Sequence, residues 1–469
     1  MDTSLNHSLK RIEQLITRPA ESLDDPEERQ AEFRRRLERT RRLMAHLGNP
    51  QDAFDLIHIG GTSGKGSIAI LCEAMLHALG QHVGTHTSPY LQTPLEKARV
   101  DGWLIDLQDA IALTDKVMEA VEAVEQEDAE LGHPHYAEAW LGFALRHFAD
   151  QQCGAAVVEV GMGGRFDATN IVMPRVSVIS TVHYDHMRVL GDTLSEIAYH
   201  KAGIIKPRVP VVVGNAPHEA LTVIHAEARR QDAPLIRLGH EVRYEPLHSS
   251  QQGGRFNYYG LGMRLEDVYL GLLGRYQFIN ATAALAAVEL FAEALGLTLD
   301  EAALRRGLAA ARFAGRMEVV QDEPRVVLDG AHNEEKINAL IASVPEVFTY
   351  RRLILVLGML ETKAADPIVG ALARLADAII TTSPEVKGKP AITADELARI
   401  AREAGTREVW AEDDPHAALE RALGMASPDD LVLVTGSLYL IGALRSRWHP
   451  TERIIEQRTM FCRPVTIQD

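Results

Sequence analysis

The glycine-rich stretch Gly61-Thr62-Ser63-Gly64-Lys65-Gly66-Ser67 decides the fold class of this chain. It follows an apolar run at residues 56–59 and precedes an amphipathic run, which predicts a strand, a loop and a helix in that order. Glycines let successive backbone N–H groups face an anion, Lys65 supplies a charge for the outer phosphates of a nucleotide, and the Ser67 hydroxyl can bind Mg²⁺. The stretch therefore predicts a nucleoside triphosphate site.

The spacing of this stretch differs from the usual G-x-x-x-x-G-K-[ST] pattern. Ile59 stands where the first glycine would be, and Gly66 is inserted between Lys65 and Ser67. The alternative interpretation is an ordinary glycine-rich turn between a strand and a helix. The flanking apolar and amphipathic runs favour phosphate binding.

Length and composition are typical of a soluble globular protein. Its 469 residues exceed one compact core and predict two domains, and 46% hydrophobic with 24% charged residues is ordinary for a globular protein. The net charge of −16 argues against a nucleic-acid partner. We expect no apolar run as long as a bilayer, no membrane contact, no signal segment and a cytoplasmic location. Cys72, Cys153 and Cys462 lie too far apart in sequence for a disulfide framework or a zinc motif.

The pattern of apolar runs predicts an α/β fold in two domains. The first alternation of strands and helices is typical of a phosphate-loop domain with a parallel sheet, and the second is typical of a Rossmann-like domain. The expected strands lie at residues 56–59, 155–160, 176–181 and 209–213, then at 325–329, 352–357, 377–381, 407–410 and 431–435. The boundary falls in the basic segment Arg312–Arg316, which divides the chain into residues 1–312 and 313–469.

Three other segments receive simpler predictions. Residues 246–262, rich in Gly, Ser, Gln and Tyr, predict a hairpin outside the main sheet, and the acidic segment 119–130 predicts a solvated helix. The tail after Arg447 has no regular apolar pattern, so the sequence does not predict where in the fold it lies.

Polar residues follow several of the predicted strands. Glu159 ends a buried strand, where a carboxylate needs either a cation such as Mg²⁺ near Ser67 or a salt bridge to Arg165. Asp185 and His186 follow the next strand, at the sheet edge where open α/β sheets bind ligands.

Further along, Thr193 and Glu196 form a capping box that begins a helix carrying Lys201, which composition alone would make a solvated surface lysine. Asp329–Asn333 and Gly436–Tyr439 each follow a strand of the second alternation. Either loop alone could be an ordinary turn, but together they favour a site.

Taken together, these segments resemble the folylpolyglutamate synthase and dihydrofolate synthase family, which is related to the Mur ligases. The resemblance covers almost the whole chain in order. It rests on Leu47–Pro50, the phosphate loop, Thr87–Leu91, Glu159–Asn170, Asp185-His186, Lys201–Lys206, Leu273–Gln277 with Asn280, Gly315-Arg316, Asp329–Asn333 and Gly436–Tyr439.

The resemblance implies an ATP-dependent amide ligase. ATP would phosphorylate a carboxylate of dihydropteroate or of a folate, and the amine of L-glutamate would displace phosphate from the acyl phosphate. Such a protein would act as a monomer on small molecules.

The resemblance also implies the site residues. ATP would be held by Gly61, Thr62, Ser63, Gly64, Lys65, Gly66 and Ser67 with Asn280, Arg316, Asp329 and His332. Two Mg²⁺ ions would be bound by Ser67, Glu159, His186 and a carbamylated Lys201, and the catalytic residues would be Lys65, Lys201 and His186. The folate-type substrate would meet Ser88, Pro89, Tyr136, Glu138, Phe166, Asp167 and Ala168.

The chain departs from the family pattern at several positions. Ser63 replaces a usual asparagine, Tyr90 a histidine, His200 a glutamate and Glu334 a proline, and Glu361–Ala364 differs from an acidic Asp-Lys-Asp pattern. Two alternatives therefore stay open: a ligase for a non-folate acid, and an ATP-binding protein that has lost ligation.

Overall fold

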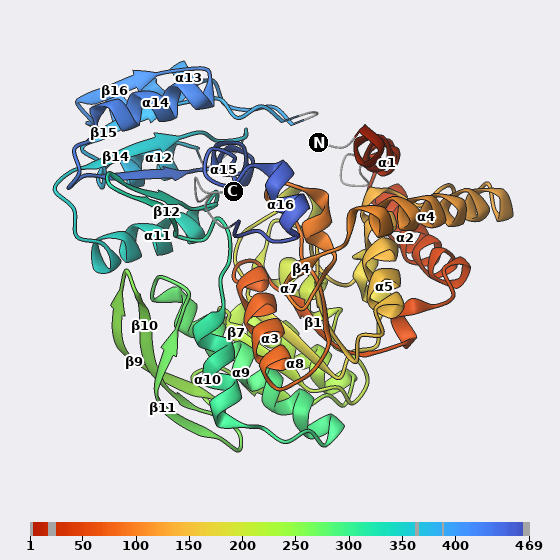
Figure 1. The fold of residues 1–469 in the computed structure, drawn as a ribbon. Helices are drawn as coiled ribbons and strands as arrows, with labels where there is room; N and C mark the ends of the chain where they lie inside the picture. Colours follow the sequence, from red (N-terminus) through yellow and green to blue (C-terminus); the bar gives the residue numbers. More distant parts are fainter. Residues whose placement is uncertain (1–2, 17–24, 362–364, 387–388, 463–469) are drawn as a thin grey trace.

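The computed structural model describes residues 3–16, 25–361, 365–386 and 389–462. These residues form an N-terminal region, built around an eight-stranded sheet, and a C-terminal region, built around a six-stranded sheet (Figure 1). The predicted α/β fold class is confirmed. Residues 362–364 of the departing segment Glu361–Ala364 lie outside the described residues.

The eight-stranded sheet carries the phosphate loop near its centre. Its strand order is β4-β3-β2-β5-β1-β6-β7-β8, parallel except for β3 and β4 at one edge. The strands are β1 (Asp55–Gly60), β2 (Val83–His86), β3 (Arg99–Val100), β4 (Trp103–Leu104), β5 (Ala155–Glu159), β6 (Val176–Thr181), β7 (Val211–Asn215) and β8 (Leu235–Arg237). All four strands predicted in this part of the chain are present.

Helices cover both faces of this sheet because successive strand residues point to opposite sides. On β1, Ile57 and Ile59 pack on the face with α3 and α9, and Leu56 packs on the face with α4 and α5. The helices are α1 (Thr3–Glu13), α2 (Pro26–His46), α3 (Lys65–Ala78), α4 (Leu107–Glu127), α5 (Tyr136–Asp150), α6 (Met187–Leu190), α7 (Leu194–Ala202), α8 (His218–Arg230), α9 (Tyr276–Leu295) and α10 (Glu301–Ala310).

The predicted solvated helix is the end of α4, which is exposed on one side and buries Ala120, Val121 and Val124 on the other.

Helix α9 corrects one expectation from the sequence. It is a 20-residue helix long and apolar enough to cross a membrane, although no such run was expected. In the structure 72% of its apolar stretch is buried inside the protein, and the helix packs against α3 in the core.

The predicted hairpin is a three-stranded antiparallel sheet. It consists of β9 (Arg243–Ser250), β10 (Gly253–Tyr259) and β11 (Arg264–Leu270), in the order β11-β10-β9. Phe256, Tyr258 and Leu270 join the same core as α9, and β9 lies against α11 (Glu334–Val347) of the C-terminal region (Figure 1).

The six-stranded sheet of the C-terminal region has the order β12-β13-β17-β14-β15-β16 and is parallel except for β12. Its strands are β12 (Glu318–Asp322), β13 (Arg325–Leu328), β14 (Leu353–Leu357), β15 (Ala378–Thr381), β16 (Glu408–Ala411) and β17 (Leu431–Thr435). Its helices are α11 (Glu334–Val347), α12 (Ala365–Ala373), α13 (Ala394–Glu403), α14 (Pro415–Met425), α15 (Leu438–Arg445) and α16 (Thr451–Gln457). Separate apolar cores lie on its two faces, as a parallel sheet requires.

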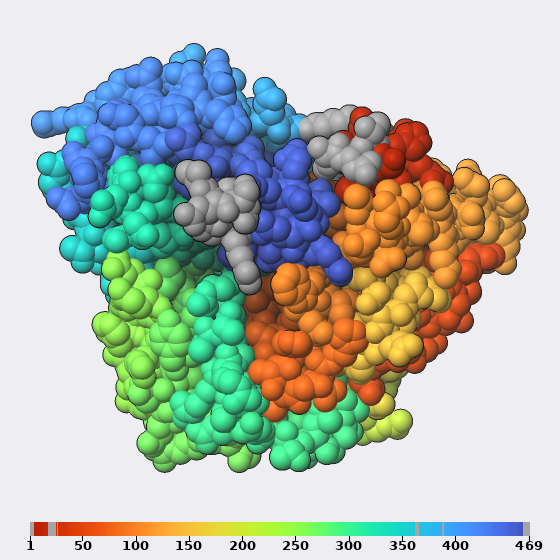
Figure 2. Space-filling model, in the orientation of Figure 1, coloured from red at the N-terminus to blue at the C-terminus, as the bar shows by residue number. Residues whose placement is uncertain are grey.

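The tail that the sequence did not place returns to the N-terminal region. After α16, the Arg458 carbonyl accepts from the Leu104 N–H at 2.8 Å, and Arg458 Nε donates to the Leu104 carbonyl at 2.8 Å. Figure 2 shows this C-terminal segment resting on the part of the surface formed by residues near 100. The tail thus connects the two regions through these two hydrogen bonds to the Leu104 backbone and through an apolar cluster that contains both Leu104 and Ile454.

Candidate active site

The phosphate loop joins β1 to α3 and requires its glycines. Gly61 and Gly64 have positive φ angles of 132° and 83°. A Cβ at Gly64 would lie 2.2 Å from Asn280 Oδ1 of α9, and one at Gly61 would lie 2.0 Å from Ser180 Oγ. The loop is therefore packed between β6 and α9, and predicted ATP residue Asn280 lies directly against it.

Lys65 folds back over this loop. Its ammonium donates to the Gly61 carbonyl at 3.2 Å and to the Thr62 carbonyl at 3.5 Å. Within the described ranges, no carboxylate forms an ion pair with Lys65, so its charge is available to an anion. Its role toward the outer phosphates of a nucleotide stays a prediction.

Glu159 lies beside the loop at the end of β5, 5% exposed. Its Oε2 accepts from the Ser88 N–H at 3.1 Å, and Lys97 donates to the Ser88 hydroxyl at 3.2 Å. Burial raises the pKa of Glu159, and Lys65, the Ser88 N–H, Arg316 and Lys97 oppose that rise. The alternative salt bridge to Arg165 does not form, because Arg165 Nη2 pairs with Glu227 at 3.3 Å.

Lys201 is buried, contrary to the expectation from composition. Helix α7 begins at the predicted capping box of Thr193 and Glu196 and buries one face, on which Lys201 follows Ile197 at helical spacing. Lys201 is 2% exposed, and burial, followed by the charge of Lys65, lowers its pKa to about 7. Nothing in the described part of the chain hydrogen-bonds or ion-pairs with its ammonium.

Asp185 and His186 follow β6 as predicted, but their exposures differ. The Asp185 side chain is 19% exposed and that of His186 is 54% exposed, with His186 Nε2 3.8 Å from Asp185 Oδ1. Across residues 3–16, 25–361, 365–386 and 389–462, no group of three or more His, Cys, Asp or Glu side chains is placed to share a metal ion. The predicted set of Ser67, Glu159, His186 and Lys201 contains only two such residues and stays a prediction.

The C-terminal region places three predicted ATP residues in two loops. Arg316 lies just before β12, and Asp329 and His332 lie in the loop after β13. Asp329, 4% exposed, accepts from the Met317 N–H at 2.9 Å and the Ala331 N–H at 2.8 Å, so it holds the loop of Arg316. The Arg316 guanidinium carbon lies 4.9 Å from the centre of the Phe313 ring. Burial and then Lys336 lower the pKa of His332 to about 3, so its imidazole is neutral.

Side chains of the first turn of α11 contact the phosphate-loop side of the N-terminal region. We call this contact the seam and define it by Ser63, His183 and Asp185 on one side and Asn333 and Glu335 on the other. Ser63 Oγ donates to Glu335 Oε2 at 2.6 Å, His183 Nε2 lies 3.4 Å from Glu335 Oε1, and Asn333 Nδ2 donates to Asp185 at 3.3 Å. The serine that departs from the family pattern therefore bonds directly to the C-terminal region.

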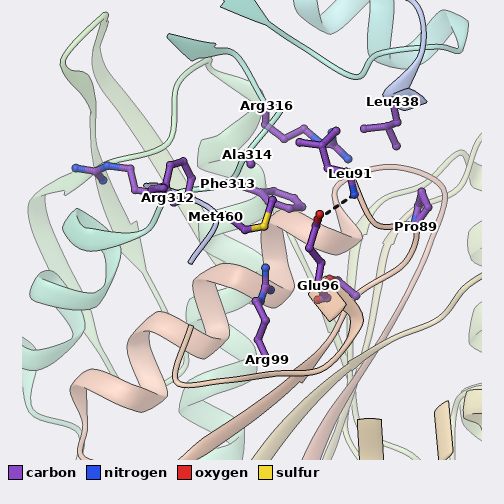
Figure 3. Close-up of a pocket in the computed structure, with 12 residues that line it drawn as sticks. Pro89, Leu91, Glu96, Arg99, Arg312, Phe313, Ala314, Arg316, Leu438 and Met460 are labelled. Atoms are coloured by element: carbon purple, nitrogen blue, oxygen red, sulfur yellow. Dashed lines mark hydrogen bonds between the residues drawn. The ribbon is translucent and has the colours of Figure 1, made fainter. Parts of the chain in front are cut away.

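A separate small pocket lies between the two regions (Figure 3). Its lining comes from both regions: Thr87, Pro89, Leu91, Glu96, Arg99, Arg312, Phe313, Ala314, Arg316, Leu438, Met460 and Phe461. Buried Glu96 accepts N–H groups from Leu91, Gln92 and Thr93 and so shapes the floor of this pocket. The cavity volume is about 30 Å³, which holds water but not a nucleotide or a pterin.

The predicted substrate residues fall into two groups. Phe166 stacks on Phe33 of α2 with ring centroids 5.2 Å apart, and His200 meets Phe166 edge-on at 5.7 Å. The centre of the Tyr136 ring lies 5.9 Å from the Lys97 ammonium. The same ammonium faces the Tyr90 ring and donates a hydrogen bond to the Ser88 hydroxyl. Aromatic faces and a cation are thus present on the N-terminal side.

Three other predicted substrate residues have structural partners. Glu138, 1% exposed, pairs with buried Arg39 at 3.1 Å and accepts the His135 N–H at 2.9 Å. Asp167 accepts from the Thr169 N–H at 3.0 Å and the Met162 N–H at 3.1 Å, and Ala168 is buried beneath them. These residues hold the loop in shape, and their contact with substrate stays a prediction.

The sequence pattern did not indicate Lys97, Glu335 or Lys336 as site residues, and it left His183, an imidazole as likely to be structural, outside the predicted site. No motif pointed to Lys97, which is 5% exposed and whose pKa burial lowers to about 8. Lys336 could have been found from its position four residues after His332, which is helical spacing.

The chain matches the Mur ligase middle domain over residues 59–288 and the Mur ligase glutamate ligase domain over residues 315–438. A relative from Bacillus subtilis (strain 168), dihydrofolate synthase/folylpolyglutamate synthase, is 35% identical over 88% of this chain and 94% of its own length. Folylpolyglutamate synthase of Mycobacterium tuberculosis complexed with ADP is 32% identical with a TM-score of 0.86, covering 95% of this chain and 98% of that one. A solved FPGS-AMPPCP-folate complex is 31% identical with a TM-score of 0.79, covering 94% of this chain and 99% of that one.

These matches run along almost the whole chain and confirm the resemblance seen in its motifs. They include both the region that holds the phosphate loop and the region that holds Arg316 and Asp329. The chain therefore belongs to the folylpolyglutamate synthase and dihydrofolate synthase family of ATP-dependent, Mur-type ligases.

Proposed function

We propose that this protein joins L-glutamate to a folate-type carboxylate, either that of dihydropteroate or that of a folate and its polyglutamates. The observation that carries the proposal is the placement of Glu159 and Lys65 together at the phosphate loop, with Arg316 close enough to oppose the rise in the pKa of Glu159. A triphosphate on the loop would thus meet charges from both regions. The relatives that bind ADP or AMPPCP with folate support the same ligands here.

The reaction has two steps, phosphorylation of the acceptor carboxylate and displacement of phosphate by the amine. A carboxylate oxygen of the acceptor attacks the γ-phosphorus of ATP, the bond to the β-phosphate oxygen breaks, and ADP leaves. The neutral amine of L-glutamate then attacks the acyl carbon, phosphate leaves, and the amine loses a proton to form the amide. Lys65 and Arg316 would stabilise the charge on the transferring phosphoryl group.

The residues present fit Mg²⁺. Glu159 is a buried carboxylate with one backbone N–H as hydrogen-bond donor and no ion-pair partner in the described ranges, and such a carboxylate is stabilised by a cation. Bound Mg²⁺ would neutralise phosphate charge, and we assign Ser67, Glu159 and His186 to hold it.

Lys201 is proposed to be carbamylated and to help hold a second Mg²⁺. A buried amine whose pKa is near 7 is partly neutral at neutral pH, which is the form that reacts with CO₂. Carbamylation would convert an unpaired buried cation next to Lys65 into an anion. Intact-mass spectrometry would detect the added CO₂, and loss of that mass in K201A would assign it.

On the acceptor side, we propose that Phe166, Ala168, Tyr136, Ser88 and Pro89 contact the folate-type substrate, with Asp167 and Glu138 shaping the loops around it. The Phe33 and Phe166 stack supports this, because aromatic rings bind flat heterocycles by stacking.

The two regions are proposed to be separate domains divided between residues 312 and 313. This is supported by the end of α10 at Ala310 and the start of the six-stranded sheet at Glu318. We further propose a cytoplasmic monomer without nucleic-acid or membrane partners, and the net charge of −16 supports the absence of a nucleic-acid partner.

The proposed function is tested by coupled release of ADP and phosphate from purified protein. Release that needs ATP, L-glutamate and a folate-type acceptor together is expected. Release that is indifferent to acceptor and amino acid would contradict ligation, and release with only a non-folate acid would contradict the substrate class.

A further inference from the structure

Lys336 is a positive charge beside the seam that the reaction described above does not use. It is the third residue of α11, and its backbone N–H donates to the Asn333 side-chain oxygen at 3.0 Å. The amide nitrogen of the same Asn333 donates to Asp185 of the N-terminal region at 3.3 Å. One asparagine thus positions Lys336 relative to both regions.

The hydrogen bonding of Lys336 leaves part of its ammonium unused. Its Nζ lies 3.2 Å from His332 Nε2, while His332 Nδ1 lies 2.8 Å from the Gly330 carbonyl. Because a carbonyl only accepts, Nδ1 carries the proton and Nε2 offers its lone pair to Lys336. An ammonium has three N–H donors, so two remain without a partner among the described residues.

The charged groups around Lys336 do not supply it with a free counter-ion. Lys65 and Arg316 are the nearby cations, and Asp185 and Glu335 are the nearby anions. Both anions already have partners, since Asp185 accepts from Asn333 and Glu335 accepts from Ser63. Within the described ranges, no carboxylate forms an ion pair with Lys336. Its pKa, lowered to about 8 by burial, is consistent with a cation that lacks a counter-ion.

We propose that Lys336 binds a substrate oxyanion at the seam, held in position by neutral His332. The ligand chemistry is a carboxylate of the incoming L-glutamate or the terminal phosphate of ATP. The loop N–H groups and Lys65 are the groups proposed to bind phosphate, which favours the carboxylate as the ligand of Lys336. This inference rests on the proposed function, because both ligands are substrates of the proposed ligase.

The test compares K336M and K336Q with K336R and with a control, K116M, in which an exposed lysine of α4 is changed. Steady-state KM is measured for L-glutamate and for ATP with the other substrates saturating, and ATP affinity is measured by calorimetry without L-glutamate. Thermal unfolding checks that each variant is folded. A lost hydrogen bond to a charged group predicts a change of about 10- to 100-fold.

If Lys336 binds the amino acid, KM for L-glutamate rises by that factor in K336M and K336Q, K336R restores most of the affinity, and ATP binding is unchanged. If it binds phosphate, ATP affinity falls instead. If both affinities in K336M and K336Q stay within about twofold of the K116M values, the inference is wrong, whatever happens to kcat or stability. A wild-type protein that makes no amide would overturn the proposed function, while the calorimetric measurement would still report on phosphate binding by Lys336.

Discussion

Ser63 of the phosphate loop donates its hydroxyl to Glu335 of α11 at 2.6 Å, which joins the nucleotide-binding loop to the C-terminal region. His183, which follows β6, lies 3.4 Å from the other carboxylate oxygen of Glu335. Glu335 therefore contacts two loops at the carboxyl edge of the eight-stranded sheet. Together with the bond from Asn333 to Asp185, these contacts hold the two regions close together in this arrangement.

We predict that E335A opens the protein. Removing the carboxylate removes both seam contacts of Glu335, so the separated arrangement should become more populated and the radius of gyration from small-angle X-ray scattering should increase without nucleotide. The matched control is E334A, which changes the exposed neighbour in the same helical turn. Equal radii for E335A and E334A would show that Glu335 does not hold the regions together.

We predict that K65A lowers the rate of ADP release by about 100-fold or more, because the charge that stabilises the transferring phosphoryl group is lost. The fold should persist, since the partners of the Lys65 ammonium among the described residues are two carbonyls of its own loop. K116A serves as the control, and thermal unfolding confirms folding. Turnover near the wild-type rate in folded K65A would remove this role from Lys65.

We predict that E159Q raises the Mg²⁺ concentration for half-maximal rate by about tenfold or more, since a charged ligand becomes a neutral amide. The matched control is E289Q, a buried glutamate that accepts from Tyr258 in the three-stranded sheet. An Mg²⁺ titration of E159Q that overlays those of wild type and E289Q would exclude Glu159 as a ligand.

Acid should destabilise the protein partly through His58. Burial, followed by the charge of Lys206, lowers the pKa of His58 to about 3, and its Nε2 lies 2.9 Å from the Thr169 hydroxyl. Between that pKa and the unfolded value near 6.5, the unfolded chain binds the extra proton, so stability falls as the pH falls through this window.

The expected slope from this one group is about 1.4 kcal/mol per pH unit. Urea unfolding at about pH 6 and about pH 4 should therefore show a smaller loss of stability for H58Q than for wild type. Identical losses would mean that His58 is not neutral in the folded protein.

Much of the fold was predictable because local patterns agree with the global structure. The apolar runs 56–59 and 431–435 form β1 and β17, and the capping box of Thr193 and Glu196 begins α7. The tail after Arg447 was not predictable, because its contacts with Leu104 depend on how the two regions pack.

The candidate site was predictable where a motif carries it and not where packing creates it. Lys65 lies in a glycine-rich loop whose pattern predicts a phosphate site, and Asp329 lies in an Asp-Gly loop whose pattern predicts a turn. The burial of Lys201 and the contact of Glu335 with Ser63 arise only when distant segments meet, so composition placed Lys201 at the surface and gave no role to Glu335. The expectation that no apolar run is as long as a bilayer was wrong for α9, whose length and apolar composition can be read in the sequence, whereas its burial against α3 is a tertiary feature.

The central claim is that ATP bound between the two regions activates a folate-type acid for attack by L-glutamate. The most direct measurement is mass spectrometry of the products, with dihydropteroate and tetrahydrofolate offered separately alongside ATP, Mg²⁺ and L-glutamate. We predict a product heavier by one glutamyl residue from at least one acceptor, formed in equal amount with ADP and absent with K65A. ATP consumption without any glutamylated product from either acceptor would contradict the account.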